Sequence, residues 1–238
     1  MTALVTGAAH GIGAACARRL ARDGHQVILA DVDVATAEEA AGRLPGSGHR
    51  AVLLDAGDPG SWRAVARDHP VVDVVVNNAA VVVRTRAHEL LEEDWDRQIA
   101  VDLSSVYHSV RAYGAALLER GGAIVNVASI HAVLGYPSHP AYAAAKGGVV
   151  ALTRQLAVDY GPAVRVNAVL PGPILTRVWD AVDEGGQRQA AAGTALQRMG
   201  RADEVAAVVG FLASADASYV TGAAIPVDGG ATVVKDSP

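Results

Sequence analysis

Residues 2–13 read Thr-Ala-Leu-Val-Thr-Gly-Ala-Ala-His-Gly-Ile-Gly, and a helical pattern of small apolar residues follows them. This stretch predicts a short strand over Thr2–Thr6, then a glycine turn, then a helix. Glycines permit a tight turn and let the backbone approach a pyrophosphate, while the helix N-terminus supplies N–H groups and a positive dipole. The spacing is G-x-x-x-G-x-G rather than G-x-G-x-x-G, so a glycine turn without a ligand stays open at this point.

The rest of the chain alternates short apolar runs with longer helical patterns. We expect strands over residues 26–30, 50–54, 71–76, 123–127, 164–170 and 223–227, and helices over residues 37–44, 61–67, 94–118, 142–160 and 203–213. Residues 184–194 are rich in Gly, Gln and Ala with weak periodicity, and we expect them to form a mobile flap. The alternation predicts an α/β fold with a parallel sheet covered on both faces. Because no repeat or linker interrupts it, we expect one domain over residues 1–238.

The composition argues against several classes of protein. The formal charge of −5 comes without a basic run, so we expect no nucleic-acid partner. The single cysteine, Cys16, fits a reducing cytosol and is expected to be a packing residue. A strand that begins almost at Met1 leaves no room for a secretory signal, and the interrupted apolar run 71–83 is too short to span a bilayer. No His or Cys pair has metal-ligand spacing. We therefore expect a cytoplasmic protein without a metal or a membrane partner.

Six residues with functional potential follow directly after expected strands. They are Gly7, Asp31, Asp55, Asn78, Ser129 and Pro171. In open α/β sheets the carboxyl ends of the strands form the edge at which ligands bind. The coincidence of six such positions predicts one shared site at that edge.

Asp31 lies eighteen residues after Gly13 and ends the second expected strand. A carboxylate there accepts hydrogen bonds from both adenosine ribose hydroxyls and repels a 2′-phosphate, which favours NAD over NADP. His10, a basic residue inside the glycine turn, points the other way, but a neutral histidine beside Asp31 should not reverse the preference. A helix cap or turn role for Asp31 is the structural alternative.

Tyr142 and Lys146 stand four residues apart in an expected helix, so they share a face. A cation a few ångström from a phenol favours the phenolate, and such a tyrosine is suited to acid–base catalysis near neutral pH. Ser129, thirteen residues upstream of Tyr142, could hold the reacting oxygen by a hydrogen bond. The alternative is an ordinary half-buried tyrosine with a surface lysine.

Taken together, these motifs resemble those of the short-chain dehydrogenase/reductase family over nearly the whole chain. The matching pieces are residues 6–13, Asp55, residues 77–79, Ser129 with Tyr142 and Lys146, Pro171 and Gly172 with Ile174 and Thr176, and residues 219–230. Several independent motifs in the same order make the resemblance specific.

The resemblance implies a Rossmann-type, doubly wound parallel sheet of seven strands and a homotetramer. It implies that Tyr142 is the acid–base, that Ser129 positions the substrate oxygen, and that Lys146 makes the phenol more acidic and binds the nicotinamide ribose. The implied cofactor contacts are Gly7, Ala9, His10, Gly11, Ile12 and Gly13 at the pyrophosphate, Asp31 at the adenosine ribose, Asp55 and Ala56 at the adenine, Asn78 along the dinucleotide, Ile174 and Thr176 at the carboxamide, and Pro171 and Gly172 beside them.

The sequence departs from the family pattern at three positions. Ala80 replaces a glycine where backbone and cofactor come close, and Ala145 replaces a serine before the lysine. Asp102 replaces an asparagine that supports a water on the proton path to the lysine. We hypothesise that Asp102 keeps this water through its backbone carbonyl. If ionised near Lys146, it would partly neutralise the cation and move the optimum for oxidation to the alkaline side. An aspartate that points to solvent or caps a kink is the alternative.

The substrate pocket is expected to be lined by His131, Tyr136, Ser138 and His139, with Val81, Val82 and Trp179 as apolar partners. The two histidines suggest a polar substrate such as a hydroxylated ring or a polyol, although surface positions for both stay open. Arg84 and Arg86 could bind a substrate carboxylate, but solvated positions are favoured for them.

The sequence therefore predicts an NAD-dependent oxidoreductase that interconverts a secondary alcohol and a ketone in a small-molecule substrate. Two alternatives remain. One is an NADPH-dependent 3-oxoacyl-thioester reductase, and the other is a dinucleotide-binding sensor or structural subunit with little turnover.

Overall fold

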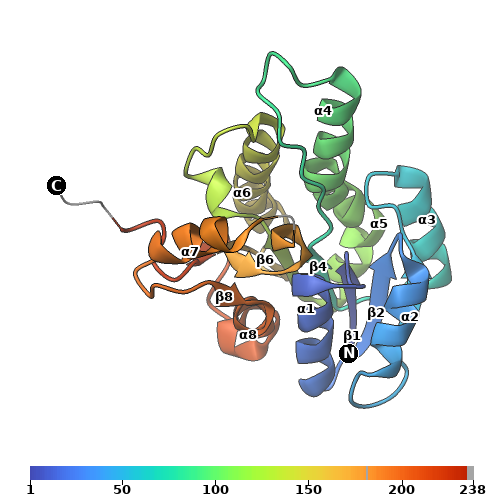
Figure 1. The fold of residues 1–238 in the computed structure, drawn as a ribbon. Coiled ribbons are helices and arrows are strands. Elements are labelled where there is room, and N and C mark those ends of the chain that lie inside the picture. Colours follow the sequence, from blue (N-terminus) through green and yellow to red (C-terminus); the bar gives the residue numbers. More distant parts are fainter. Residues whose placement is uncertain (181, 235–238) are drawn as a thin grey trace.

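The computed structural model describes residues 1–180 and 182–234, and within them seven parallel strands form one sheet (Figure 1). These strands are β1 (Thr2–Thr6), β2 (Gln26–Asp31), β3 (Arg50–Leu53), β4 (Val74–Asn77), β5 (Gly122–Val127), β6 (Val164–Pro171) and β9 (Ala224–Val227). Their order across the sheet is β3-β2-β1-β4-β5-β6-β9. The predicted Rossmann-type sheet is confirmed. Residues 235–238, the last four of the expected single domain, lie outside the described residues.

The order of the strands reverses between β1 and β4, which are neighbours in the sheet. Side chains tie the two strand ends together at this point. Thr6 Oγ1 accepts the N–H groups of Asn78 and Ala79, both at 2.9 Å, and Asn78 Nδ2 donates to the carbonyls of Thr6 at 2.9 Å and Gly7 at 3.1 Å. A reversal of this kind opens the crevice in which doubly wound sheets bind ligands.

Helices cover both faces of the sheet. Residues from α1 (Gly11–Arg22), α2 (Val34–Gly42) and α8 (Ala202–Ala213) pack in one buried cluster, and residues from α3 (Pro59–Asp68), α5 (Ser105–Arg120) and α6 (Pro140–Tyr160) pack in the other. Successive side chains of a strand point to opposite faces. Ala3 and Val5 of β1 accordingly join the first cluster, and Leu4 joins the second.

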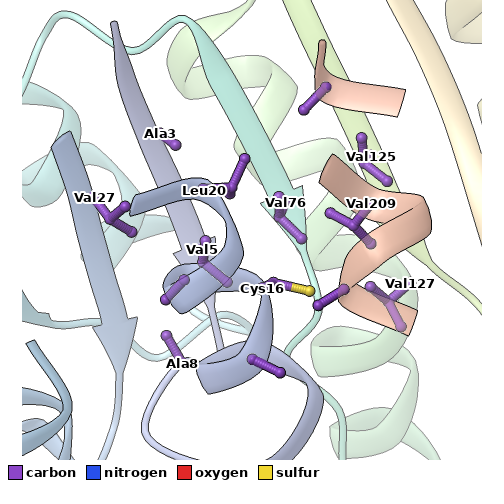
Figure 2. Packing of buried hydrophobic residues seen from close by; sticks show 14 of the residues in the cluster. Ala3, Val5, Ala8, Cys16, Leu20, Val27, Val76, Val125, Val127 and Val209 are labelled. Atoms are coloured by element: carbon purple, nitrogen blue, oxygen red, sulfur yellow. The ribbon is translucent and has the colours of Figure 1, made fainter. Parts of the chain in front are cut away.

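Cys16 lies on α1 in the first cluster and is fully buried. Figure 2 shows its thiol among the side chains of Val76, Val127 and Val209, which belong to β4, β5 and α8. Burial raises the pKa of the thiol to about 12. The prediction that Cys16 is a packing residue is confirmed.

The helix expected over residues 94–118 is not a single α-helix. It consists of α4 (Glu92–Ile99), a π-helical turn η1 (Ala100–Ser104) and α5. The spacing of apolar residues in the sequence does not reveal a single wide turn, because the residues on either side of it keep a helical period. Single π-helical turns inside α-helices frequently mark functional sites, and Asp102 lies within this one.

The expected flap contains a helix, α7 (Glu184–Ala192), which begins where the Asp183 side chain accepts the N–H of Gly186 at 2.7 Å. The segment between residues 176 and 199 leaves the sheet region after β7 (Ile174–Leu175) and returns at β8 (Gly200–Arg201), and these two short strands pair in parallel. The short helix η3 (Arg177–Trp179) opens the segment. The mobility of the expected flap stays a prediction.

Short helices also follow β5, at η2 (Ile130–Ala132), and α8, at η4 (Ala215–Ala217). None of the helices within residues 1–180 and 182–234 is long and apolar enough to span a bilayer.

Candidate active site

A cavity of about 430 Å³ opens at the carboxyl ends of the central strands. All six residues singled out after the expected strands line it, namely Gly7, Asp31, Asp55, Asn78, Ser129 and Pro171. His10, Gly11, Ile12, Ala56, Tyr142, Lys146, Gly172, Ile174 and Thr176 line it as well. The structure thus brings nearly all of the predicted site residues to one place. The predicted site residues Ala9, Gly13 and Asp102 are not among the described residues that line it.

The glycine turn has the shape of an anion cradle. Gly7 and Gly11 have φ angles of +62° and +53°, which side-chain-bearing residues rarely adopt. A Cβ on Gly13 would lie 2.1 Å from the Gly7 carbonyl oxygen. Within the described residues, the His10 side chain does not cap α1, and the first turn of that helix carries no acidic residue. The helix N-terminus and the bare backbone therefore fit a pyrophosphate group.

Two carboxylates lie at the end of the cavity next to β2 and β3. Asp31 accepts the N–H groups of Ala9 at 2.9 Å and Asp33 at 3.0 Å, so the backbone fixes its side chain. Asp55 accepts the Gly57 N–H at 2.9 Å. This end fits a nucleoside, whose ribose hydroxyls offer donors to a fixed carboxylate.

Arg97 was missed from the sequence, yet it lines the cavity and contacts both carboxylate oxygens of Asp55 at 3.1 Å. It comes from α4, far from Asp55 along the chain. A single arginine in a charged helix carries no periodic signal that would reveal such a contact.

Arg177 was also missed. It opens the 176–199 segment, lines the cavity, and places Nη1 2.6 Å from His10 Nε2. The same His10 nitrogen lies 3.6 Å from a carboxylate oxygen of Asp33. His10 is therefore already engaged by both a cation and an anion. Its position in the glycine turn is as expected, but the pairing with Arg177 could not be inferred from the sequence.

The three predicted catalytic side chains meet at the other end of the cavity. Lys146 is 2% exposed, with Nζ 5.5 Å from the centre of the Tyr142 ring and 3.1 Å from the Val127 carbonyl oxygen, to which it donates. Ser129 Oγ accepts the backbone N–H of His131 at 3.2 Å. That bond uses an acceptor lone pair of the serine and leaves its hydroxyl hydrogen free to donate.

Buried amides align the elements that carry these groups. Asn77 at the end of β4 donates to Asn126 of β5 at 2.8 Å, and Asn126 donates to Thr153 of α6 at 2.9 Å. The chain of side chains couples the strand before Ser129 to the helix that carries Tyr142 and Lys146. Two of these three residues gave no functional signal in the sequence.

Asp102 is 2% exposed, so the alternative of an aspartate that points to solvent is wrong. Its Oδ1 accepts the Val81 N–H at 2.8 Å. Burial raises the pKa of Asp102, although the charge of Lys146 acts in the opposite direction. Burial thus acts against the ionised state on which the hypothesis of an alkaline oxidation optimum depends.

The substrate side is lined by Val81, Val82 and Trp179, as expected. The four polar residues expected with them, namely His131, Tyr136, Ser138 and His139, are not among the described residues that line the cavity, and neither are Arg84 and Arg86.

His131 instead packs against the ring of Tyr142. Its ring stacks on Tyr136 with 4.3 Å between centres, and it meets the Tyr142 ring edge-on at 5.0 Å and the His139 ring at 4.9 Å. Burial, followed by the nearby charges of His139 and Arg84, lowers the pKa of His131 to about 4. The imidazole next to Tyr142 is therefore neutral at physiological pH.

Among residues 1–180 and 182–234, no group of three or more His, Cys, Asp or Glu side chains gathers as metal ligands would. The cavity lining presents the hydroxyl of Ser129, the phenol of Tyr142 and the buried ammonium of Lys146.

Comparison with known proteins agrees with this arrangement. A family model described as enoyl-(acyl carrier protein) reductase matches residues 7–232. The chain is 39% identical to D-threitol dehydrogenase of Mycolicibacterium smegmatis, with 97% of this chain and 92% of that protein covered. It is 38% identical to meso-2,3-butanediol dehydrogenase of Serratia marcescens (99% and 96% covered), and 37% identical to a 3-oxoacyl-[acyl-carrier-protein] reductase of Thermotoga maritima (97% of each covered).

Solved structures give the same answer. A short chain dehydrogenase/reductase family protein superposes with a TM-score of 0.92 at 36% identity, covering 98% of each chain. A putative 2-deoxy-D-gluconate 3-dehydrogenase from Agrobacterium tumefaciens, solved with bound NADP, superposes with a TM-score of 0.91 at 34% identity, covering 98% of this chain and 96% of that one. The sheet, the glycine cradle, the Ser129–Tyr142–Lys146 group and these relatives together show that the chain belongs to the short-chain dehydrogenase/reductase family and is an oxidoreductase.

Proposed function

We propose that the protein is an NAD-dependent dehydrogenase that interconverts a secondary alcohol and a ketone, with Tyr142 as its general acid–base. The observation that carries the proposal is the buried Lys146 ammonium beside the Tyr142 ring, in the cavity that also holds Ser129 and the glycine cradle. A buried cation one helical turn from a phenol favours the phenolate, which is the form that accepts a proton.

Each of the three side chains has one task. Ser129 donates its free hydroxyl hydrogen to the substrate oxygen and holds it near the phenol. Tyr142 takes the hydroxyl proton during oxidation and returns it to the carbonyl oxygen during reduction. Lys146 stabilises the phenolate between these steps and binds the ribose next to the nicotinamide. The nicotinamide, when bound, supplies the hydride acceptor or donor.

The preference for NAD is supported by the charge at the adenosine end. Asp31 faces the cavity, and Asp33 contributes a second carboxylate nearby. A 2′-phosphate in this place would meet two negative charges. His10 offers little compensation, because it is already shared between Asp33 and Arg177. One relative was solved with bound NADP, so the fold itself does not exclude a 2′-phosphate, and local charges such as these must set the preference.

We expect a small, uncharged, polar substrate. The cavity wall near Tyr142 is apolar at Val81, Val82 and Trp179, and the neighbouring His131 is neutral. Relatives named for a polyol and for a diol fit this expectation. Oxidation of the alcohol is the proposed direction, because cells keep NAD largely oxidised.

The relative named as a 3-oxoacyl-thioester reductase keeps a second candidate in view. That activity would use NADPH and a long acyl carrier arm, and Asp31 argues against the former. A sensor or structural subunit with little turnover is the third candidate, and the complete set of Ser129, Tyr142 and Lys146 argues against it.

We place the protein in the cytosol as a homotetramer acting on a small-molecule substrate, without a nucleic-acid or membrane partner. Tyr107 and Leu118, three turns apart on α5, and Val158 on α6 are exposed apolar side chains that an assembly would cover. The mass of the native particle, measured by light scattering during gel filtration, tests the assembly.

The activity is tested by titrating the protein with NADH and with NADPH by fluorescence and by assaying a panel of polyols, diols, cyclic alcohols and 3-oxoacyl thioesters. We expect tighter binding of NADH and turnover of a polyol or diol with NAD. Tight NADH binding without turnover on any compound would favour the sensor, and NADPH-dependent reduction of thioesters would favour the reductase.

A further inference from the structure

The backbone of Val81 is held by two side chains from the helix opposite. Gln98 of α4 donates through Nε2 to the Val81 carbonyl at 2.7 Å, and Asp102 of η1 accepts the Val81 N–H at 2.8 Å. Both side chains are buried, with exposures of 0% and 2%. Together they occupy the donor and the acceptor of one residue, as the backbone of a neighbouring strand would do.

This contact fixes the far end of a short loop that lines the cavity. The near end is already held, because Thr6 Oγ1 accepts the N–H groups of Asn78 and Ala79. Residues 79–82 all line the cavity, and Ala80 lies exposed between the two anchors. The position of the Ala80 methyl group relative to a bound cofactor therefore depends on both anchors.

Two oxygen atoms in the same contact are buried and have no hydrogen-bond partner among the residues that the structure describes. They are Oδ2 of Asp102 and Oε1 of Gln98. The glutamine oxygen is always an acceptor, and an ionised aspartate also has only acceptors and no hydrogen to donate. A buried charge with a bare oxygen is costly, whereas a protonated carboxyl group is neutral and adds one donor to this acceptor-rich place.

We propose that Gln98 and Asp102 are positioning residues that clamp the 79–82 loop against the cavity, and that Asp102 does so as a neutral carboxylic acid. Gln98 supplies the donor and Asp102 the acceptor, so the pair holds both backbone polar groups of Val81. Lys146 of α6 is the charged group that acts on Asp102, and its positive charge would favour ionisation. Burial outweighs that charge, because the pKa of Asp102 is raised despite it.

The protonation state has a direct chemical consequence. A neutral Asp102 leaves the charge of Lys146 undiminished, so the ammonium acts on Tyr142 at full strength. The kinetic part of this inference rests on the proposed dehydrogenase activity, whereas its structural part does not. The experiments below therefore include two measurements that require no turnover.

Infrared difference spectroscopy tests the neutral acid. The spectrum of the native protein at neutral pH minus that of the Asp102→Asn variant should contain the carbonyl stretching band of a protonated carboxyl group, which ionised carboxylates lack. Asparagine has nearly the same shape and keeps an acceptor for the Val81 N–H, so the variant should fold. A difference spectrum that contains carboxylate bands instead would overturn the neutral state.

Hydrogen exchange tests the clamp. In Gln98→Leu, which keeps the volume but removes the donor, the amides of residues 79–82 should exchange faster than in the native protein. Gln155→Leu is the matched control, because Gln155 lies on the exposed side of α6 and bonds only Asp159 there among the described residues. Equal exchange in the two variants would show that Gln98 does not hold the loop.

Kinetics then connect the clamp to the reaction. Loss of one buried hydrogen bond should lower kcat of Gln98→Leu by about tenfold, with a smaller change in NADH affinity. The Asp102→Asn variant should keep the native pH profile for oxidation. A profile that shifts toward acidic pH would mean that a negative charge had been removed from beside Lys146, which contradicts a neutral Asp102.

Discussion

The two ends of the cavity differ in how fully their polar groups are bonded. At the adenosine end, Asp31 is fixed by two backbone N–H groups, and Asp55 by one together with Arg97. Next to the reaction end, outside the cavity lining, Asp102, Gln98 and His131 each keep a buried polar atom without a partner among the described residues. Buried polar groups are normally satisfied, and exceptions in native proteins tend to lie where function needs them. The side chains at the adenosine end are thus already fixed by hydrogen bonds, whereas those next to the reaction end keep polar atoms without a partner among the described residues.

The comparison predicts its largest effect at the reaction end, where Tyr142→Phe removes the proton acceptor. We expect kcat to fall by about 10²- to 10⁴-fold, the usual contribution of general acid–base catalysis. NADH affinity should change little, because the glycine cradle and the carboxylates are untouched. Steady-state kinetics and fluorescence titration check both halves of the prediction, and a variant that kept its native turnover would remove Tyr142 from the mechanism.

A smaller effect is expected at the adenosine end, where Asp31→Asn removes a charge while keeping the shape and one acceptor. The affinity for NADH should fall by about tenfold, as expected for the loss of a hydrogen bond to a charged group, and the affinity for NADPH should rise. Asp68→Asn on the exposed end of α3 is the matched control. Fluorescence titration with both dinucleotides gives the answer, and unchanged discrimination between them would show that Asp31 does not read the ribose.

The smallest effect concerns His131, whose pKa lies at about 4 in the folded protein against an ordinary value of 6.5. Between these values the unfolded chain binds more protons, so the stability contributed by the neutral side chain is present above pH 6.5 and is lost as the pH falls toward 4. His131→Gln should therefore lose less in Tm than the native protein over this interval, on the order of a few degrees. Thermal unfolding at several pH values measures the difference, with the exposed His88→Gln as control; parallel curves for His131→Gln and the native protein would contradict it.

The sequence was sufficient to predict the strands and the functional residues that follow directly after them. Six functional residues each follow a strand, namely Gly7, Asp31, Asp55, Asn78, Ser129 and Pro171. A parallel sheet brings such positions to one edge whatever the details of packing. The bounds of the strands were predicted to within a few residues for the same reason.

The remaining features depend on contacts between segments that are remote along the chain. The wide turn at η1 leaves no trace in the apolar period, and Gln98 looks like an ordinary helical glutamine until Val81 is placed against it. Arg97 and Arg177 are unremarkable charges in the sequence that become cavity residues only through the fold. The four polar residues around position 131 were expected in the pocket because they are near Tyr142 in sequence. Three of them, His131, Tyr136 and His139, instead form an aromatic cluster that contacts the Tyr142 ring.

The pairing of β7 with β8 has a further consequence. It joins the two ends of the 176–199 segment at a narrow neck, so the polypeptide leaves the body of the protein and rejoins it at neighbouring points. Surface segments that start and finish at neighbouring points tolerate replacement well. The segment carries Val178 and Trp179 to the cavity wall, so it is the natural place at which to vary the substrate range.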